Sequence, residues 1–403
     1  MRERIIFVLL AGFAVVLLLF TLVAHLKDGS SSSDLMGFYT AGTLLKRGLR
    51  SQVYDENAQL ALQKRLFGRT VPVDLYDHPP FETLPYWALA YLPYSTAYVL
   101  WDLLSLTMLG WSLYLLKPYA AHFDTGSRLV LTLTVLFPLI STLREGQNQI
   151  ALLLACAAAF VCLKKRQEFA AGALIGAGLF RFQFVLPLLL VFLIIKRWRI
   201  ILGAVAAAAT LALVSLALVG WAGIRDYIEL VLRLAKSSAF PTLVPAMPNV
   251  RGFVDVLLRG RVAARYLTAL VVAGSLALLA WPVIKWRRRR WDPGEKSFDL
   301  LFSLSMVVCV MISYHSLIHS LVVLTLPALL LLDQTSGAHE LAQRRWLSKL
   351  PLILLFLMTV FLNAAGGNRF SFLLVPILWL AVVIAGEVPR ARESLGEGER
   401  GNF

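Results

Sequence analysis

Apolar runs recur along most of this chain at lengths that suit a lipid bilayer. The first extends from Ile5 to Leu26, about the length needed to cross the hydrocarbon core. Eleven more follow, with approximate bounds at 95–117, 127–143, 147–163, 169–180, 183–195, 200–222, 264–284, 298–313, 317–332, 350–365 and 370–386. The pattern predicts an all-α polytopic membrane protein, a single integral membrane domain over 1–403 with about twelve transmembrane helices.

Two of these runs are too short to cross separately. The runs 169–180 and 183–195 hold about a dozen apolar residues each, whereas a spanning helix needs about 20. We expect a re-entrant or tilted pair among the other helices.

The first run is open to two interpretations. The short basic start at Met1–Arg4 and the apolar run behind it are typical of a signal peptide. However, the run is long and no small-x-small cleavage site follows it. We interpret it as a retained helix with its N-terminus in the cytoplasm, which places both chain ends there.

Two long polar regions interrupt the apolar pattern, a first outer loop at 27–94 and a second at 222–265. Periodic apolar positions predict amphipathic helices in both, lying along the membrane interface. In the first loop, Asp55 and Gly68 are suited to cap the two ends of a helix. The predicted apolar faces are Leu35, Phe38, Tyr39 and Leu45; then Ala58, Ala61, Leu62 and Leu66; and, in the second loop, Ile224, Tyr227, Ile228 and Val231.

Composition agrees with the membrane assignment. The chain is 58% hydrophobic, its mean hydropathy is +0.71, and its formal charge is +15. The basic residues cluster in short segments at 164–166, 196–199 and 285–290. Such clusters mark cytoplasmic loops and contact anionic lipid headgroups, so we expect membrane lipids and no nucleic acid as partners.

The three cysteines carry no chemical signal. Cys156, Cys162 and Cys309 all fall inside apolar runs and show neither metal-ligand spacing nor a disulfide framework. We expect them to fill the core.

Asp34 is the first candidate for chemistry. It opens the stretch DLMGFYTAG, where the first apolar run meets the outer polar region. One interpretation is an N-cap, since SSSD before a helix is a good capping sequence. The other is a general base acting on a lipid-borne substrate. Both can hold at once.

Polar residues are also bracketed tightly between apolar runs. Arg181 lies between two short runs, where an unpaired charge is costly, so it either faces a polar cavity or reaches outward to headgroups. The turn REGQNQ holds Arg144, Glu145, Gln147 and Asn148, and Gln183 follows Arg181.

The late turn SYHSLIH holds His315 and His319. Their spacing of four places both on one face if the segment is helical, either as interfacial histidines or as part of a site. No third ligand stands at zinc spacing, so we expect no metal and no cofactor.

Together these residues predict an outward-facing cavity that holds one carboxylate, two arginines and two histidines. Arginine and histidine suit a phosphate, and a lone carboxylate suits a general base. This set fits displacement of a lipid phosphate from an activated sugar with inversion, because a phosphate leaves without a protonated acid behind it.

The order and spacing of several motifs resemble the polyprenol-phosphate-mannose-dependent mannosyltransferases of glycosyltransferase family 87, within the GT-C superfamily. The resemblance runs through most of the chain. It rests on Asp34, Phe38, Tyr39, Ala41 and Gly42; the segment Gly48 to Asp55; Tyr76, Pro79, Pro80 and the L-P-Y motif; Trp101; Gly146 and Gln147 with Asn148 or Gln149; Ala171 to Arg181; and the late histidine turn.

The resemblance implies a GT-C-type bundle that transfers mannose from a polyprenyl-phosphate donor to a lipid or glycan acceptor, without a metal, on the outer side of the cell membrane. Asp34 is then the catalytic base, and Arg181 stands where the family commonly has lysine. Phe182 departs from the proline that follows this lysine in the family. The residues that we expect to bind the donor phosphate are Arg181, Arg144, His315 and His319. The residues that we expect to contact substrate are Tyr39, His78, Gln147, Asn148 and Gln183.

Other interpretations stay open at this stage. A GT-C enzyme could use another lipid-linked donor, as enzymes of the aminoarabinose or O-antigen-ligase type do. A transporter or flippase of a lipid-linked sugar would show charges deep in the spans and an inverted repeat, and neither is clear here. A non-catalytic scaffold would leave the cavity arginines and histidines without a role.

Overall fold

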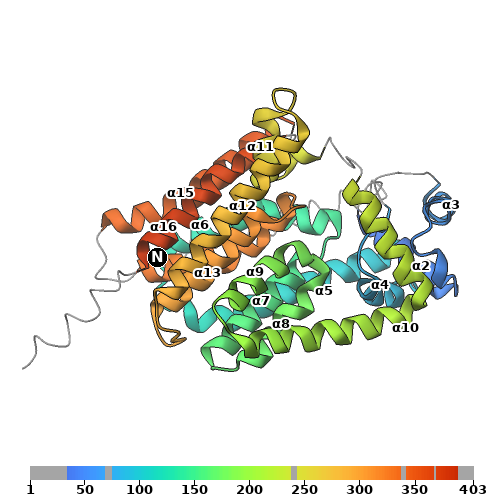
Figure 1. The fold of residues 1–403 in the computed structure, drawn as a ribbon, viewed down its shortest axis with the longest axis horizontal. Helices are drawn as coiled ribbons and strands as arrows, with labels where there is room; N and C mark the ends of the chain where they lie inside the picture. Colours follow the sequence, from blue (N-terminus) through green and yellow to red (C-terminus); the bar gives the residue numbers. More distant parts are fainter. Residues whose placement is uncertain (1–33, 69–74, 237–242, 337–341, 367–368, 389–403) are drawn as a thin grey trace, which may run out of the picture.

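The computed structural model describes residues 34–68, 75–236, 243–336, 342–366 and 369–388. It is 82% helical, with no strand among the residues described, which confirms the all-α prediction (Figure 1). The predicted first apolar run at 5–26 lies outside the described residues, so its interpretation as a retained helix stays a prediction.

Fifteen α-helices are described in the chain's resolved order. They are α2 (Leu35–Lys46), α3 (Glu56–Phe67), α4 (Thr83–Leu89), α5 (Tyr94–Leu116), α6 (Thr125–Glu145), α7 (Gln149–Lys164), α8 (Glu168–Ala177), α9 (Phe182–Ile194), α10 (Trp198–Lys236), α11 (Val250–Leu258), α12 (Ala264–Arg287), α13 (Lys296–Ile312), α14 (Thr325–Thr335), α15 (Ala342–Ala364) and α16 (Leu374–Glu387). The 3₁₀-helices are η1 (Arg50–Gln52), η3 (Pro80–Glu82), η4 (Lys117–Tyr119), η5 (Gly178–Arg181), η6 (Val244–Ala246), η7 (Ile318–Leu324) and η8 (Phe370–Leu373).

Eight segments of the described residues are long and apolar enough to cross a membrane, so the expected count of about twelve is not confirmed. Two predicted spans, α7 and α13, are helical but have only 16 and 17 residues. At about 1.5 Å per residue they are only about 24 and 26 Å long. The eight segments are Tyr94–Tyr119, Thr125–Glu145, Glu168–Ile194, Trp198–Arg233, Ala264–Arg287, Ile318–Thr335, Arg345–Ala364 and Phe370–Glu387.

The segment Glu168–Ile194 folds back on itself. Glu168, at the start of α8, lies 3.6 Å from the guanidinium of Arg197, just beyond the end of α9. The two helices therefore begin and end on the same side, and the 3₁₀-helix η5 forms the turn between them. This agrees with the expected re-entrant pair, because neither helix is long enough to cross alone.

Glycines let α8 lie directly against α10. A Cβ on Gly172 would come within 1.9 Å of the Ile200 carbonyl oxygen, and one on Gly203 within 2.0 Å of the Phe169 oxygen. Small residues of this kind allow close backbone approach between membrane helices. The contact fixes the height of η5 relative to α10.

The long helix α10 bends at Gly220, whose φ of +70° favours glycine. Beyond the bend it packs on the N-terminal layer, our name for residues 34–89, which Figure 1 shows at one side of the molecule. Tyr227 lies 5.3 Å from Tyr54, ring to ring. The predicted interfacial face at 224–231 is therefore partly wrong: Ile224 and Tyr227 pack on protein, and Ile228 is half exposed.

The N-terminal layer is more deeply packed than the sequence predicts. Helix α2 is buried on every side from Leu35 to Leu45, so it is not an amphipathic interfacial helix. In α3 the caps are as predicted: Asp55 accepts a hydrogen bond from the Ala58 amide, and Gly68 has φ +71°. Its predicted face is wrong, since the buried positions are Gln59, Leu62 and Gln63. Polar groups occupy that side because the Gln59 side chain bonds the backbone of Val53 and Tyr76.

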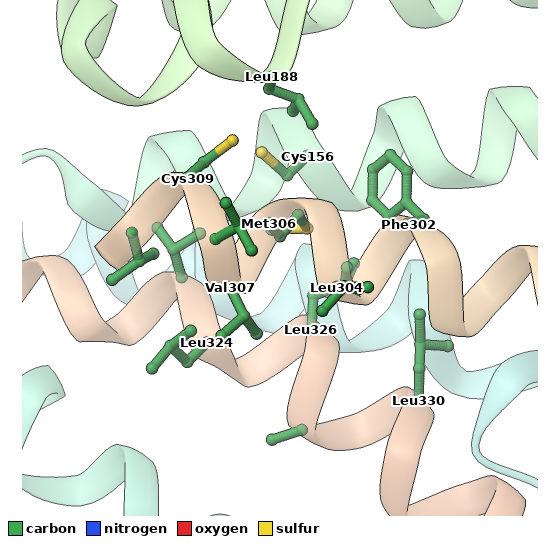
Figure 2. Packing of buried hydrophobic residues seen from close by; sticks show 14 of the residues in the cluster. Cys156, Leu188, Phe302, Leu304, Met306, Val307, Cys309, Leu324, Leu326 and Leu330 are labelled. Atoms are coloured by element: carbon green, nitrogen blue, oxygen red, sulfur yellow. The ribbon is translucent and has the colours of Figure 1, made fainter. Parts of the chain in front are cut away.

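The core of the bundle surrounds α13. Figure 2 shows its side chains, among them Phe302 and Met306, packed against leucines of η7 and α14. Cys156 and Cys309 are buried in this cluster, and all three cysteines are free, as expected for core residues.

The three basic segments meet at one end of the bundle, which we call the basic end. Arg166 pairs with Asp292 at 3.1 Å, Arg197 stacks on the Trp291 ring at 4.2 Å, and Arg287 donates to the Ile194 carbonyl. The opposite end, where α6 meets α7 and α13 meets η7, carries the polar residues described next.

Candidate active site

Arg181 stands at the tip of the α8–α9 hairpin and is almost fully buried, at 6% exposure. Its backbone is non-helical (φ −116°, ψ 57°), because the 3₁₀ turn ends there and α9 begins at the next residue. The hairpin thus lifts one cation from a frame of apolar helices to the end of the bundle opposite the basic end.

Two neutral amides hold the Arg181 guanidinium. Its Nε donates to Asn148 Oδ1 at 2.9 Å, and its Nη2 donates to Gln147 Oε1. The two amides follow Gly146, whose φ of +64° ends α6 in a left-handed cap, so they lie in the tight α6–α7 turn. A Cβ at Gly146 would come within 2.6 Å of Leu35, which ties this turn to α2.

Each amide also binds a carboxylate. Gln147 Nε2 donates to Asp34 Oδ2, and Asn148 Nδ2 donates to Glu82 Oε1. Because guanidinium only donates and carboxylate only accepts, this arrangement sets the orientation of both amides. One buried cation is therefore bridged to two carboxylates without touching either.

Asp34 does not cap α2. It occupies the N-cap position, but its side chain accepts no hydrogen bond from the helix backbone. The capping interpretation is wrong here because the carboxylate turns toward Gln147 instead. Burial raises the pKa of Asp34 above its usual 3.8, and this outweighs the opposing effects of Gln147, His78 and Arg181.

Glu82 is the site residue that sequence reasoning missed, so the expected single carboxylate is wrong. Its carboxylate is buried in the N-terminal layer at 6% exposure. Its Oε2 lies 3.2 Å from His78 Nδ1, four residues earlier. The available signal was an acidic residue inside a proline- and aromatic-rich segment, YDHPPFE, where an exposed charge is not expected.

His78 is brought to the site as predicted, and its charge state follows from its neighbours. Burial alone would lower its pKa, but the Glu82 carboxylate outweighs this, so the pKa of His78 lies above its usual 6.5. Its ring packs on Phe38 at 4.7 Å, and its carbonyl accepts from the Tyr54 hydroxyl.

A small pocket of about 270 Å³, including its open part, lies on the far side of Arg181 between α7, α9 and the α13–η7 connection. Its polar lining is neutral apart from the arginine. Ser316 Oγ is buried there without a hydrogen-bond partner. The polar lining residues are Gln149, Arg181, Gln183, Ser313, His315, Ser316 and Ser320.

The two late histidines do not share a helical face. The α13 helix ends at Ile312, His315 lies in the connection, and His319 is in the 3₁₀-helix η7, so the spacing rule of an α-helix does not apply. Gln183 donates to the His315 carbonyl at 3.2 Å. Burial, with help from nearby cations, lowers the pKa of His315 to about 4, so this ring is neutral near pH 7.

Three other predicted site residues lie apart from the amide network. The Arg144 side chain is exposed, and only its carbonyl is engaged, by the Tyr98 hydroxyl. Tyr39 donates its hydroxyl to the Leu92 carbonyl at 2.7 Å and packs on Tyr94. His319 is buried, and its carbonyl accepts from Thr142. Within the described part of the chain, no group of three or more His, Cys, Asp or Glu is placed to hold a metal ion.

Searches of curated proteins and of solved structures find no match to this chain. The model of glycosyltransferase family 87 matches residues 76–313. The match includes Glu82, both amides and Arg181, and excludes Asp34 and the late histidines. It covers more than half of the 403 residues, so the chain belongs to glycosyltransferase family 87 and is a multi-pass membrane glycosyltransferase.

Proposed function

We propose that this enzyme transfers a sugar, mannose by its resemblance to the characterised members of its family, from a polyprenyl-phosphate donor to a lipid or glycan acceptor. The observation that carries this proposal is the state of Arg181. Its guanidinium is buried and held by two neutral amides, and no carboxylate lies within ion-pair distance among the described residues.

A buried cation without a contacting anion is costly. Burying a charge is tolerated only when partners compensate for it, and the two amides supply dipoles but no charge. The guanidinium has five N–H donors, of which Asn148 and Gln147 take two. Because Arg181 also lines the pocket, its remaining donors support a bound anion there, and a phosphate matches the planar fork of arginine.

The pocket wall supports a phosphate ester. Ser313, Ser316 and neutral His315 supply hydrogen-bond donors without adding charge. The unpartnered Ser316 hydroxyl is the kind of group that a ligand oxygen would satisfy. We keep Arg181, His315 and Gln183 as donor-binding residues, and we leave out Arg144 because its side chain faces away.

Asp34 is proposed as the general base. It would accept the proton of the acceptor hydroxyl while the acceptor oxygen forms a bond to the anomeric carbon. The bond from that carbon to the phosphate oxygen breaks, and its electron pair leaves with the phosphate, which Arg181 stabilises. Attack opposite to the leaving group inverts the anomeric configuration. The step calls for one base, one leaving phosphate and no metal.

The proposed side of the membrane rests on the basic end. Segments rich in lysine and arginine remain in the cytoplasm, and the three such segments meet at the end of the bundle opposite Asp34. This supports an active site on the outer face of the cell membrane, within reach of a lipid-linked donor in the outer leaflet.

The test is sugar transfer by purified protein with synthetic donors. Radiolabelled mannose is offered as polyprenyl-phosphate-mannose or as a nucleotide-activated sugar, with membrane lipid extract as acceptor and a chelator present. We expect label to move only from the lipid-linked donor, giving a product of inverted anomeric configuration. Transfer from the nucleotide-activated donor would contradict the proposed donor class. Transfer of other sugars from the same lipid phosphate at an equal rate would contradict mannose specificity alone.

A further inference from the structure

We propose that Glu82 and His78 form a positioning pair that holds Arg181 through Asn148 and keeps Asp34 charged, without either residue reacting with substrate. This inference rests on the proposed function of Asp34 and Arg181. It assigns a role to a carboxylate that the proposed chemistry leaves unused.

The first step of the argument is the orientation of Asn148. An asparagine amide can present either its oxygen or its nitrogen to Arg181, and only the oxygen can accept from Nε. The Glu82 carboxylate accepts from the Asn148 amide nitrogen, which turns the amide oxygen to Arg181 at 2.9 Å. Glu82 therefore fixes the plane of the guanidinium through one intermediate.

The second step is the rigidity of the pair. His78 and Glu82 flank two prolines, and the loop is tied down by the Tyr76 hydroxyl, which donates to the Pro79 carbonyl at 2.7 Å. The Thr83 hydroxyl likewise donates to the Pro80 carbonyl at 2.6 Å. A carboxylate on such a loop can hold a partner in place at low entropic cost.

The third step is electrostatic. A charged Glu82 favours a protonated His78, and a protonated His78 favours the ionised form of Asp34. Removing the Glu82 charge removes both effects. The other groups whose charges act on this pair are Asp34, Asp77 and Arg181, the histidines His315 and His319, and the phenols Tyr54, Tyr76, Tyr86 and Tyr227.

Glu82 is less suited than Asp34 to act as the base. One of its oxygens accepts from Asn148, and the other faces His78 at 3.2 Å. A proton taken from an acceptor would have to displace one of these contacts. Asp34 has one printed contact, from Gln147, so its second oxygen is available.

The test compares Glu82→Gln with Glu56→Gln in the full-length protein. Both variants remove one negative charge from the N-terminal layer, but Glu56 is exposed in the first turn of α3 and touches none of the network. Two readouts are used: the pH profile of kcat/KM for transfer, and the ring ¹⁵N signal of His78 in histidine-labelled protein. The chain has six histidines, so His78→Gln assigns that signal.

With Glu82→Gln we expect kcat/KM to fall about 10- to 100-fold, the range for losing a hydrogen bond to a charged group. We also expect its acid limb to move to higher pH and His78 to lose its proton at lower pH. Glu56→Gln should match the wild type in both readouts. An unchanged acid limb and an unchanged His78 titration in Glu82→Gln would overturn the inference. The ring titration decides it even if the wild type fails to use polyprenyl-phosphate sugars, which would contradict the proposed function separately.

Discussion

Asp34 and Arg181 are joined through the single amide of Gln147, which donates to the carboxylate and accepts from the guanidinium. They do not form a direct ion pair. A direct pair would neutralise both groups and would compete with a phosphate for the arginine and with an acceptor proton for the aspartate. The amide keeps both charges available while holding them in a fixed relation.

This separation makes the two Arg181 substitutions informative. We expect Arg181→Gln to raise KM for a polyprenyl-phosphate donor by about 10- to 100-fold, the range for a charge-assisted hydrogen bond. Arg181→Lys should lie between this variant and the wild type, because lysine keeps the charge but not the fork that reaches both amides. The check is steady-state kinetics with the donor varied. Arg144→Gln, which alters an exposed side chain, serves as the control and should leave KM within about twofold.

The pH dependence follows from the state of Asp34. A base works when ionised, and burial raises its pKa above 3.8, so transfer falls as the pH is lowered through that raised value. We expect kcat/KM of the wild type to show an acid limb above the ordinary aspartate range. A rate that stayed flat down to pH 3.8 would contradict the assignment of Asp34 as a buried base.

Tyr39 tests whether a residue expected at the substrate serves packing instead. Its hydroxyl already donates to the Leu92 carbonyl at 2.7 Å. We expect Tyr39→Phe to cost about 1 kcal/mol of stability and to lower the thermal unfolding temperature, because it leaves a carbonyl without its partner. Transfer per folded molecule should stay within about twofold of the wild type. A raised KM with unchanged stability would return Tyr39 to the substrate site.

The α8–α10 contact predicts a large difference between two glycine substitutions. Gly172→Ala places a methyl group 1.9 Å from the Ile200 carbonyl oxygen, so we expect a loss of about 1–3 kcal/mol from overpacking, with lower yield and lower unfolding temperature. Gly110→Ala on α5 meets nothing within 4 Å and should be neutral or slightly stabilising. Equal unfolding temperatures for the two variants would mean that the hairpin does not pack on α10 as described.

The sequence predicts the frame of this protein better than its site. Most apolar runs became helices near the expected bounds, because membrane spans depend on length and hydropathy, which are local properties. The histidine spacing misled because α13 ends at Ile312, and no residue pattern announced that the next turns would be 3₁₀. The face of α2 misled because a helix buried on all sides carries apolar residues on all sides.

Glu82 shows why the rest of the site was out of reach. Its partner Asn148 is 66 residues away, and nothing local to either residue indicates the contact. Asp34, Gln147 and Arg181 were identified, but only as separate candidates. Their relation depends on the α6–α7 turn and the hairpin tip arriving at one place, which is a property of the tertiary packing.

The most direct test of the central claim is single-turnover transfer from polyprenyl-phosphate-mannose by the wild type, Asp34→Asn and Asp226→Asn. The control removes a carboxylate from the outer part of α10, which takes no part in the network. We predict that Asp34→Asn slows transfer by about 10²- to 10⁴-fold with donor binding within a few-fold of the wild type, whereas Asp226→Asn transfers at the wild-type rate. Transfer by Asp34→Asn at the wild-type rate would contradict the account.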